Sequence, residues 1–350
     1  MRLILFVLIS TLSSYSFAKS KTNPDISLNT LFTYQQSNLG NHPDAESTNG
    51  FALQEAELRL TSNIDTYFRG DVILALEKEA PEAPGEESEF VVEPEEVFIE
   101  TLSIPGVTIR LGKFYPFWGR TNQRHTHNFA FIDAPFTRSF IFGDEGFNEN
   151  GLAISYLVPL PWYSEVVLQA FSAQNEQIFG SRSQDDVAGV LFLKNLWDVS
   201  DASTFELDLS YGTGEDVLSE RNHIYNSALT YKYKNNFRSF ILTAEYTMAE
   251  KLYDDSPNNV GRSSALSNWF KLQFNKYWWL QARYEVASNL EDKNIKDVTK
   301  STGLIAYVPS EYSAIRLQYD KIDDPSLNDT EQRATLQLNL TMGTHPAHDY

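Results

Sequence analysis

The chain has 350 residues, contains no cysteine and carries a formal net charge of −19. The absence of cysteine excludes disulfides, and the acidic balance argues against nucleic acid as a partner. Residues 1–18 combine Arg2, an apolar run and a small-x-small site that ends at Ala18, which is the pattern of a cleaved signal peptide. An exported chain of this kind is a secreted enzyme, a periplasmic binding protein or an outer-membrane barrel.

After the signal peptide, apolar and polar residues alternate with a period of two, which is typical of β-strands. The alternation predicts sixteen strands within the region 19–350. In chain order they span 26–36, 51–62, 66–78, 90–101, 107–115, 151–159, 162–173, 187–197, 204–212, 224–234, 237–249, 265–275, 278–288, 302–308, 312–321 and 332–342. Short turns alternate with longer polar loops, so we expect an all-β transmembrane antiparallel barrel with both termini at the periplasmic rim.

The two faces of the predicted strands differ in chemistry. Leucines share one face with tyrosines and phenylalanines that gather near the strand ends, as in the aromatic belts of membrane proteins. The opposite face carries charges of both signs, which suit a watery interior: Glu206, Asp208, Lys232, Glu245, Lys271, Arg283, Glu285 and Arg316. A secreted sandwich or propeller is the alternative, because alternation alone does not separate these folds.

The longest interval without a predicted strand is the stretch 116–150, which is the third long loop in strand order. A loop of this length is usually functional or disordered. Disordered segments lack aromatic residues, whereas this one contains many, among them Phe129, Phe131 and Phe142. We therefore expect a packed loop with a function.

Two histidines of this loop, His125 and His127, form a His-x-His pair. On extended backbone both rings point the same way, and neutral imidazole suits zinc, copper or nickel. Asp133, Asp144 or Glu145 is the candidate third ligand. His345 and His348 form a second, looser candidate metal site near the chain end. The alternative is that the loop histidines hydrogen-bond within the loop and that the terminal pair is a polar tail.

A catalytic function is not indicated. The sequence has no Gly-x-Ser-x-Gly elbow, no cysteine nucleophile and no glycine-rich phosphate loop. An aspartate–histidine pair of His125 and Asp133 leaves a barrel hydrolase as a further hypothesis. We expect no enzymatic activity and no required cofactor.

Motifs in and around the long loop resemble those of a known family. They are EEVFIET at 95–101, RLGKF at 110–114, HTH at 125–127, FIDAP at 131–135, FGD at 142–144 and GTHPAH at 343–348. The likeness is to proteobacterial outer-membrane proteins labelled zinc-regulated outer-membrane receptors, and it covers roughly 90–151 and 343–350. The general architecture is similar to that of the sixteen-stranded porins, including the phosphate-selective ones.

The resemblance implies a channel in the outer membrane of a Gram-negative bacterium, through which small hydrophilic solutes diffuse passively. It also implies zinc or another divalent ion as cargo or as a loop ligand. Porins of this architecture fold the third loop into the lumen and form trimers, so we expect the same loop position and a homotrimer in contact with lipid and lipopolysaccharide.

One part of the family label does not fit this chain. An energised receptor needs an amino-terminal plug and a barrel of about 22 strands, and residues 19–25 leave no room for a plug. We therefore expect passive transport. The alternative is a metal-binding receptor or scaffold with a closed lumen.

Charged side chains at the narrowest point set the selectivity of such a channel. We expect the constriction to be lined by residues of the loop and of the strands that face it: Glu55, Glu57, Arg59, Arg69, Asp71, Glu96, Glu100, Arg110, Arg120, Arg124, Asp133 and Arg138. Opposed acidic and basic clusters would set a transverse field that favours small polar solutes. The alternative is a solvated wall of charges that selects nothing.

Overall fold

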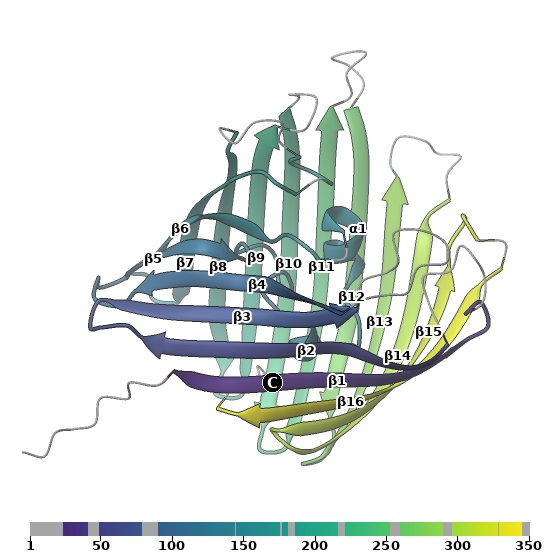
Figure 1. The fold of residues 1–350 in the computed structure, drawn as a ribbon. Coiled ribbons are helices and arrows are strands. Elements are labelled where there is room, and N and C mark those ends of the chain that lie inside the picture. Colours follow the sequence, from purple (N-terminus) through teal and green to yellow (C-terminus); the bar gives the residue numbers. More distant parts are fainter. Residues whose placement is uncertain are drawn as a thin grey trace, which may run out of the picture.

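The computed structural model describes residues 24–40, 49–78, 90–143, 145–175, 177–180, 186–215, 221–252, 260–289, 296–327 and 329–344. Sixteen antiparallel strands pair in chain order and close into a barrel where β1 meets β16 (Figure 1). The predicted fold class and strand count are confirmed. The predicted signal peptide, Asp144, His345 and His348 lie outside the described residues. No helix in the described ranges is long and apolar enough to cross a membrane.

The strands are β1 (Asp25–Ser37), β2 (Gly50–Asn63), β3 (Phe68–Lys78), β4 (Phe90–Thr101), β5 (Val107–Phe114), β6 (Glu149–Leu157), β7 (Tyr163–Phe171), β8 (Ala188–Ser200), β9 (Ser203–Glu215), β10 (Arg221–Asn235), β11 (Arg238–Leu252), β12 (Val260–Gln273), β13 (Trp278–Asn289), β14 (Val298–Ser310), β15 (Ser313–Asp323) and β16 (Glu331–Gly343). Several of them, such as β9 and β10, extend further toward the long loops than the alternation predicts. The hydrogen-bonded ladder continues there past the point where the apolar face ends.

The connections sort by length onto the two rims of the barrel. One rim carries short turns such as the one between β10 and β11, where Asn235 pairs with Arg238. The first strand begins and the last strand ends at this rim, where Ser27 pairs with Gly343. The longer connections, including the one from β5 to β6, leave from the opposite rim. Outer-membrane barrels have this arrangement, with the short turns on the periplasmic side.

The barrel is apolar outside and polar inside. The outward side chains of Leu229 and Leu317 are 45% and 50% exposed, whereas the inward Glu285 and Asp320 are both 0% exposed. Such a continuous apolar surface is unfavourable in water, but it is the surface that a barrel presents to lipid. The predicted separation of the two faces is confirmed.

The connection from β5 to β6 folds back into the barrel, as expected for the third long loop (Figure 1). It contains a short 3-10 helix, η1 (Thr126–Asn128), and one helix, α1 (Phe136–Phe142). Helix α1 contacts β11, β12 and β13, which lie across the lumen from β5 and β6. We refer to residues 115–148 as the inner loop.

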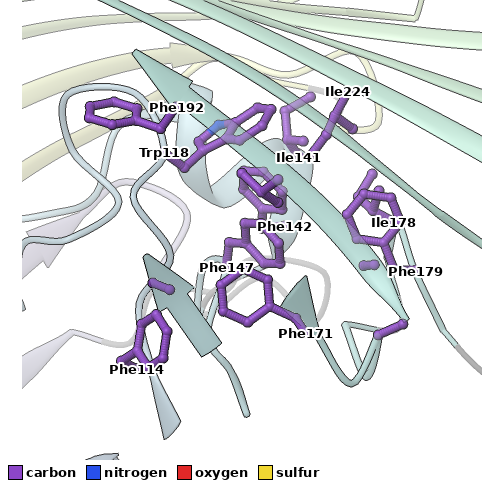
Figure 2. Close-up of a cluster of buried hydrophobic side chains, with 14 of the residues drawn as sticks. Phe114, Trp118, Ile141, Phe142, Phe147, Phe171, Ile178, Phe179, Phe192 and Ile224 are labelled. Atoms are coloured by element: carbon purple, nitrogen blue, oxygen red, sulfur yellow. The ribbon is translucent and has the colours of Figure 1, made fainter. Parts of the chain in front are cut away.

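A cluster of aromatic side chains fastens the inner loop to the barrel wall (Figure 2). Phe147 is completely buried, and its ring centroid lies 4.9 Å from that of Phe142 and 5.8 Å from that of Phe171 on β7. Trp118 packs edge-on against Phe142. The aromatic content that predicted a packed loop therefore belongs to a core inside the barrel.

Candidate functional site

A β-bulge in β4 turns two successive glutamates toward the inner loop. In the pairing of β3 with β4, Ile73 lies opposite Glu96 and Leu74 lies opposite Pro94, so Glu95 is the extra residue. A bulge interrupts the alternation of side chains and re-aims them. As a result, both Glu95 and Glu96 contact the inner loop, although strict alternation would point one of them outward.

His125 lies at the start of η1 and is enclosed by carboxylates of β2 and β4. Its Nδ1 is 3.0 Å from Glu95 Oε2 and 3.2 Å from Glu57 Oε2. Its Nε2 is 2.9 Å from Glu96 Oε2. Burial by itself would lower the pKa of His125, but the negative charges of Glu57 and Glu95 raise that pKa well above its ordinary value.

His127 faces the same side of the loop as His125, although residues 126–128 form the 3-10 helix η1 and not the extended backbone on which the prediction relied. The two imidazole rings are stacked, with centroids 6.0 Å apart. The Nδ1 of His127 lies 3.1 Å from Glu57 Oε2, the same oxygen that lies beside His125. Glu55 and Glu57 of β2, together with His127, form a second set of possible ligand groups. The candidate site therefore has two overlapping triads, Glu57–Glu95–His125 and Glu55–Glu57–His127, each with ligand atoms within 4.8 Å of one another.

Asp133 and Glu145 belong to neither triad, which corrects the expectation that one of them is the third metal ligand. The carboxylate of Asp133 forms ion pairs with Lys300 and with Arg283, whose Nη2 is 2.7 Å away, and accepts a hydrogen bond from Gln318. Burial by itself would raise the pKa of Asp133, but these two cations hold it well below its ordinary value. Asp133 therefore anchors the inner loop to β13, β14 and β15.

The inner loop is also anchored to β9 and β11. Arg120 donates through Nη1 to Glu206 at 2.5 Å and through its backbone N–H to Glu245 at 2.8 Å. The backbone N–H of Gly119 donates to Ser210 Oγ at 3.0 Å. Gly119 has a φ of 53°, and a Cβ at this position would meet the carboxylate of Glu245. Glycine is therefore the residue that fits both the backbone conformation and the close approach.

Several of the predicted constriction charges pair with each other on the wall. Arg59 Nη2 is 2.6 Å from Asp71, and Arg69 Nη2 is 3.1 Å from the same carboxylate oxygen. Arg110 Nη2 is 2.6 Å from Glu100. The charges of Arg110 and Glu100 largely cancel at a distance, whereas Arg59 and Arg69 share one carboxylate and leave one positive charge on this part of the wall.

Arg124 and Arg138, the other two predicted arginines, lie beside open space in the lumen. Arg124 lines a cavity near the short turns. The guanidinium of Arg138 lies over the rings of Tyr115 and Phe129, 5.1 Å and 5.2 Å from their centroids, and lines cavities toward the long loops. Stacking of this kind fixes the direction of an arginine without neutralising its charge.

The lumen contains cavities on both sides of the inner loop. A cavity of about 580 Å³ toward the long-loop rim is lined by Lys300 and Arg333, among others. A cavity of about 80 Å³ near the short turns is lined by Lys271 and Arg316, among others. Phe129 borders both cavities and is 5% exposed. The segment that carries Phe129 therefore separates them.

Sequence reasoning missed some of the residues that hold the inner loop. Period-two alternation placed Glu206, Glu245 and Arg283 on the inward face, but it gave no sign that they bind the loop. Glu95 and Lys300 were not selected for the site. A bulge next to a proline, as at Pro94, is the signal that could have drawn attention to Glu95.

The comparisons with known proteins agree with this architecture. No protein-family model matches the chain. An uncharacterised protein of Aquifex aeolicus is 25% identical over an alignment of 352 residues, which covers 88% of this chain and 72% of that protein. The outer-membrane channel DcaP of Acinetobacter baumannii superimposes with a TM-score of 0.61 at 10% identity, covering 93% of this chain and 99% of that one.

Two further solved structures are similar. An anion-selective porin from Comamonas acidovorans has a TM-score of 0.57 at 12% identity and covers 91% of this chain and 98% of its own. OprB of Pseudomonas putida has a TM-score of 0.58 at 11% identity, with coverages of 91% and 94%. The chain has the fold of the outer-membrane porins. At these identities the likeness concerns the porin fold alone, and solutes and selectivity do not follow from it.

Proposed function

We propose that the protein is a porin-like channel of the Gram-negative outer membrane, through which small hydrophilic solutes diffuse passively. One observation supports this most directly: charged side chains such as Glu285 and Asp320 are buried on the inward face, and leucines such as Leu229 face outward. A closed barrel satisfies all backbone hydrogen bonds within hydrocarbon. Its apolar outer surface fits membrane lipid, with lipopolysaccharide as the neighbour in the outer leaflet.

The inner loop sets the route through this channel. Solutes would enter the cavity toward the long loops, pass Phe129 and leave by the cavity that Lys271 and Arg316 line. The aromatic cluster around Phe147 closes the part of the lumen beside it. Solutes would be selected by their size where they pass Phe129, and by their charge in the two cavities on either side of it.

A metal-binding receptor with a closed lumen is the second candidate function. It is favoured by the separation of the two cavities at Phe129 and by the two histidine–carboxylate triads. Such a barrel would hold an ion at the inner loop without passing other solutes.

Recordings in planar lipid bilayers separate the two functions. The channel predicts steady ohmic current steps, and Phe129→Ala should enlarge them because it shortens the side chain between the two cavities. Phe140→Ala is the matched control, since Phe140 is 40% exposed and lines the cavity toward the long loops. Steps that appear in groups of three would support a homotrimer. Absence of steps in both the native protein and Phe129→Ala would reject the channel.

A further inference from the structure

The carboxylate of Glu57 occupies an unusual position between two imidazoles. Its Oε2 lies 3.2 Å from the Nδ1 of His125 and 3.1 Å from the Nδ1 of His127. Glu57 is 1% exposed, and this oxygen accepts no hydrogen bond. A buried carboxylate oxygen is normally hydrogen-bonded, because it has lost its water. Here the oxygen is held by ion-pair contacts with the two imidazoles, and these three ligand atoms converge on the same small volume inside the lumen.

The separations between these atoms fit a metal coordination shell. Ligand atoms about 2.0–2.1 Å from a zinc ion lie about 3.3 Å from one another in a tetrahedral site and about 2.9 Å in an octahedral one. The Nδ1 of His125 lies 3.2 Å from Glu57 Oε2 and 3.0 Å from Glu95 Oε2. A cation can be bound here with small movements of side chains that already converge.

The other nitrogen of His125 is arranged as in many metal-binding histidines. Its Nε2 is 2.9 Å from Glu96 Oε2, which is hydrogen-bonding distance. A metal-bound imidazole commonly donates its remaining N–H to a carboxylate, which fixes the ring and strengthens the ligand. Glu96 is placed to do this while Nδ1 faces Glu57 and Glu95. The bulge in β4 is what makes both contacts of His125 possible.

The charge of the cluster favours a divalent cation. Four carboxylates, those of Glu55, Glu57, Glu95 and Glu96, lie around two imidazoles and are 12% exposed or less. Nearby like charges in a buried site repel one another. A protonated His125 would neutralise one of the four charges, whereas a divalent cation would neutralise two. Imidazole together with carboxylate suits zinc and its neighbours in the first transition row better than magnesium or calcium.

The cluster is accessible from the lumen. Glu55 and Glu95 line a cavity of about 240 Å³ that also borders Glu145 and Asn148 of the inner loop. His127 lines the separate cavity near the short turns. The shared ligand, Glu57, therefore lies between residues that face two different compartments of the lumen.

We propose that the two triads around Glu57 form a binding site for a divalent transition-metal cation, with Glu57 as the common ligand. His125 and Glu95 complete the site on one side, and His127 and Glu55 complete it on the other. The inference rests on the proposed function only in that the cation reaches the cluster through the lumen. Zinc binding is measured at equilibrium in detergent and does not require transport. A protein that fails to bind zinc would therefore reject the metal site, and the conductance measurements would still test the channel.

The test is titration of the chelator-treated, detergent-purified protein with zinc chloride in competition with a chromophoric chelator. Glu57→Gln keeps the shape of the side chain and removes its charge, so it should weaken zinc binding at least about tenfold. Asp208→Asn is the matched control, because Asp208 is also 1% exposed on the inward face and belongs to neither triad. It should bind zinc as the native protein does.

X-ray absorption at the zinc edge identifies the ligand atoms directly. The native protein should show scattering from imidazole rings, and the double variant His125→Ala with His127→Ala should lose it. Native zinc bound through oxygen alone would reject the site, because it would indicate an adventitious ion on exposed acidic groups. Equal zinc affinity of the native protein and Glu57→Gln would reject it as well.

Discussion

Asp133 shows how one side chain can hold the inner loop in place. Its carboxylate pairs with Arg283 and Lys300, whose side chains are 1% and 5% exposed. Asp133 itself is 28% exposed, but removing it would leave the buried Lys300 without this carboxylate, whereas Arg283 would keep its ion pair with Glu285. The loop segment beside Phe129 is therefore held to the wall by contacts with two buried cations.

We expect Asp133→Asn to lower the free energy of unfolding by about 3 kcal/mol at neutral pH. The pKa of Asp133 is lowered in the folded protein, so its contribution is present above the unfolded value of about 3.9 and is lost as pH falls through the folded value. The difference between native protein and variant should therefore shrink at acidic pH. Denaturant unfolding in detergent at several pH values measures it, and a pH-independent difference would contradict the assignment.

Single residues also mark the limit of what the sequence could predict. The rings of His125 and His127 face one side as predicted, but the prediction assumed extended backbone where the structure has the 3-10 helix η1. Of the carboxylates around the histidines, Glu95 could not be predicted, because it faces inward only through a bulge that interrupts the alternation. Asp133 was assigned to the wrong partners, since a sequence pattern does not say which wall a loop residue reaches.

At the scale of elements, the inner loop behaves as a small core within the barrel. Its aromatic residues predicted packing correctly, and the absence of alternation predicted that it is not a strand. What the sequence could not show is the wall against which it packs. The wall is determined by the closure of β1 on β16. This closure places β11 to β13 across the lumen from β5 and β6, where helix α1 of the inner loop contacts them.

Phe147→Ala tests whether this core holds the loop. Phe147 is 0% exposed and lies between Phe142 and Phe171, so truncation should cost about 3–5 kcal/mol of stability through lost burial and a residual cavity. The loosened loop should also give larger and noisier current steps in bilayers. Phe237→Ala, at a turn where Phe237 is 58% exposed, is the control and should change neither quantity. Unchanged unfolding and conductance in Phe147→Ala would show that the loop is held elsewhere.

At the scale of the whole molecule, the outward face was the most predictable property. Period two and the placement of leucine and tyrosine predicted both the strand number and the lipid-facing side. The strand ends were less predictable, because the ladder of β9 and β10 continues beyond the apolar band. The ends of β9 and β10 pair through backbone hydrogen bonds, as Arg221 does with Glu215, without an outward apolar side chain that the sequence pattern could reveal.

Depth within the membrane gives a prediction for the entire barrel. Leu229 lies near the middle of β10 and Tyr233 lies near its end. Leu229→Arg should destabilise the protein in lipid vesicles by about 2–4 kcal/mol, and Tyr233→Arg by about 0–1 kcal/mol, because charge is costly at the centre of the bilayer and tolerated at its surface. Urea unfolding from vesicles measures both. Equal effects at the two positions would contradict a membrane-spanning β10.

Cysteine labelling during bilayer recording shows which face of the barrel lines the solute pathway, since the native chain contains no cysteine that would react. Ala314 lines the cavity near the short turns, and its neighbour Ile315 is 46% exposed on the outside. A charged, membrane-impermeant methanethiosulfonate should reduce the current through Ala314→Cys in discrete steps and leave Ile315→Cys unchanged. A block at Ile315→Cys with none at Ala314→Cys would show that the faces are reversed and that the lumen is not the solute pathway.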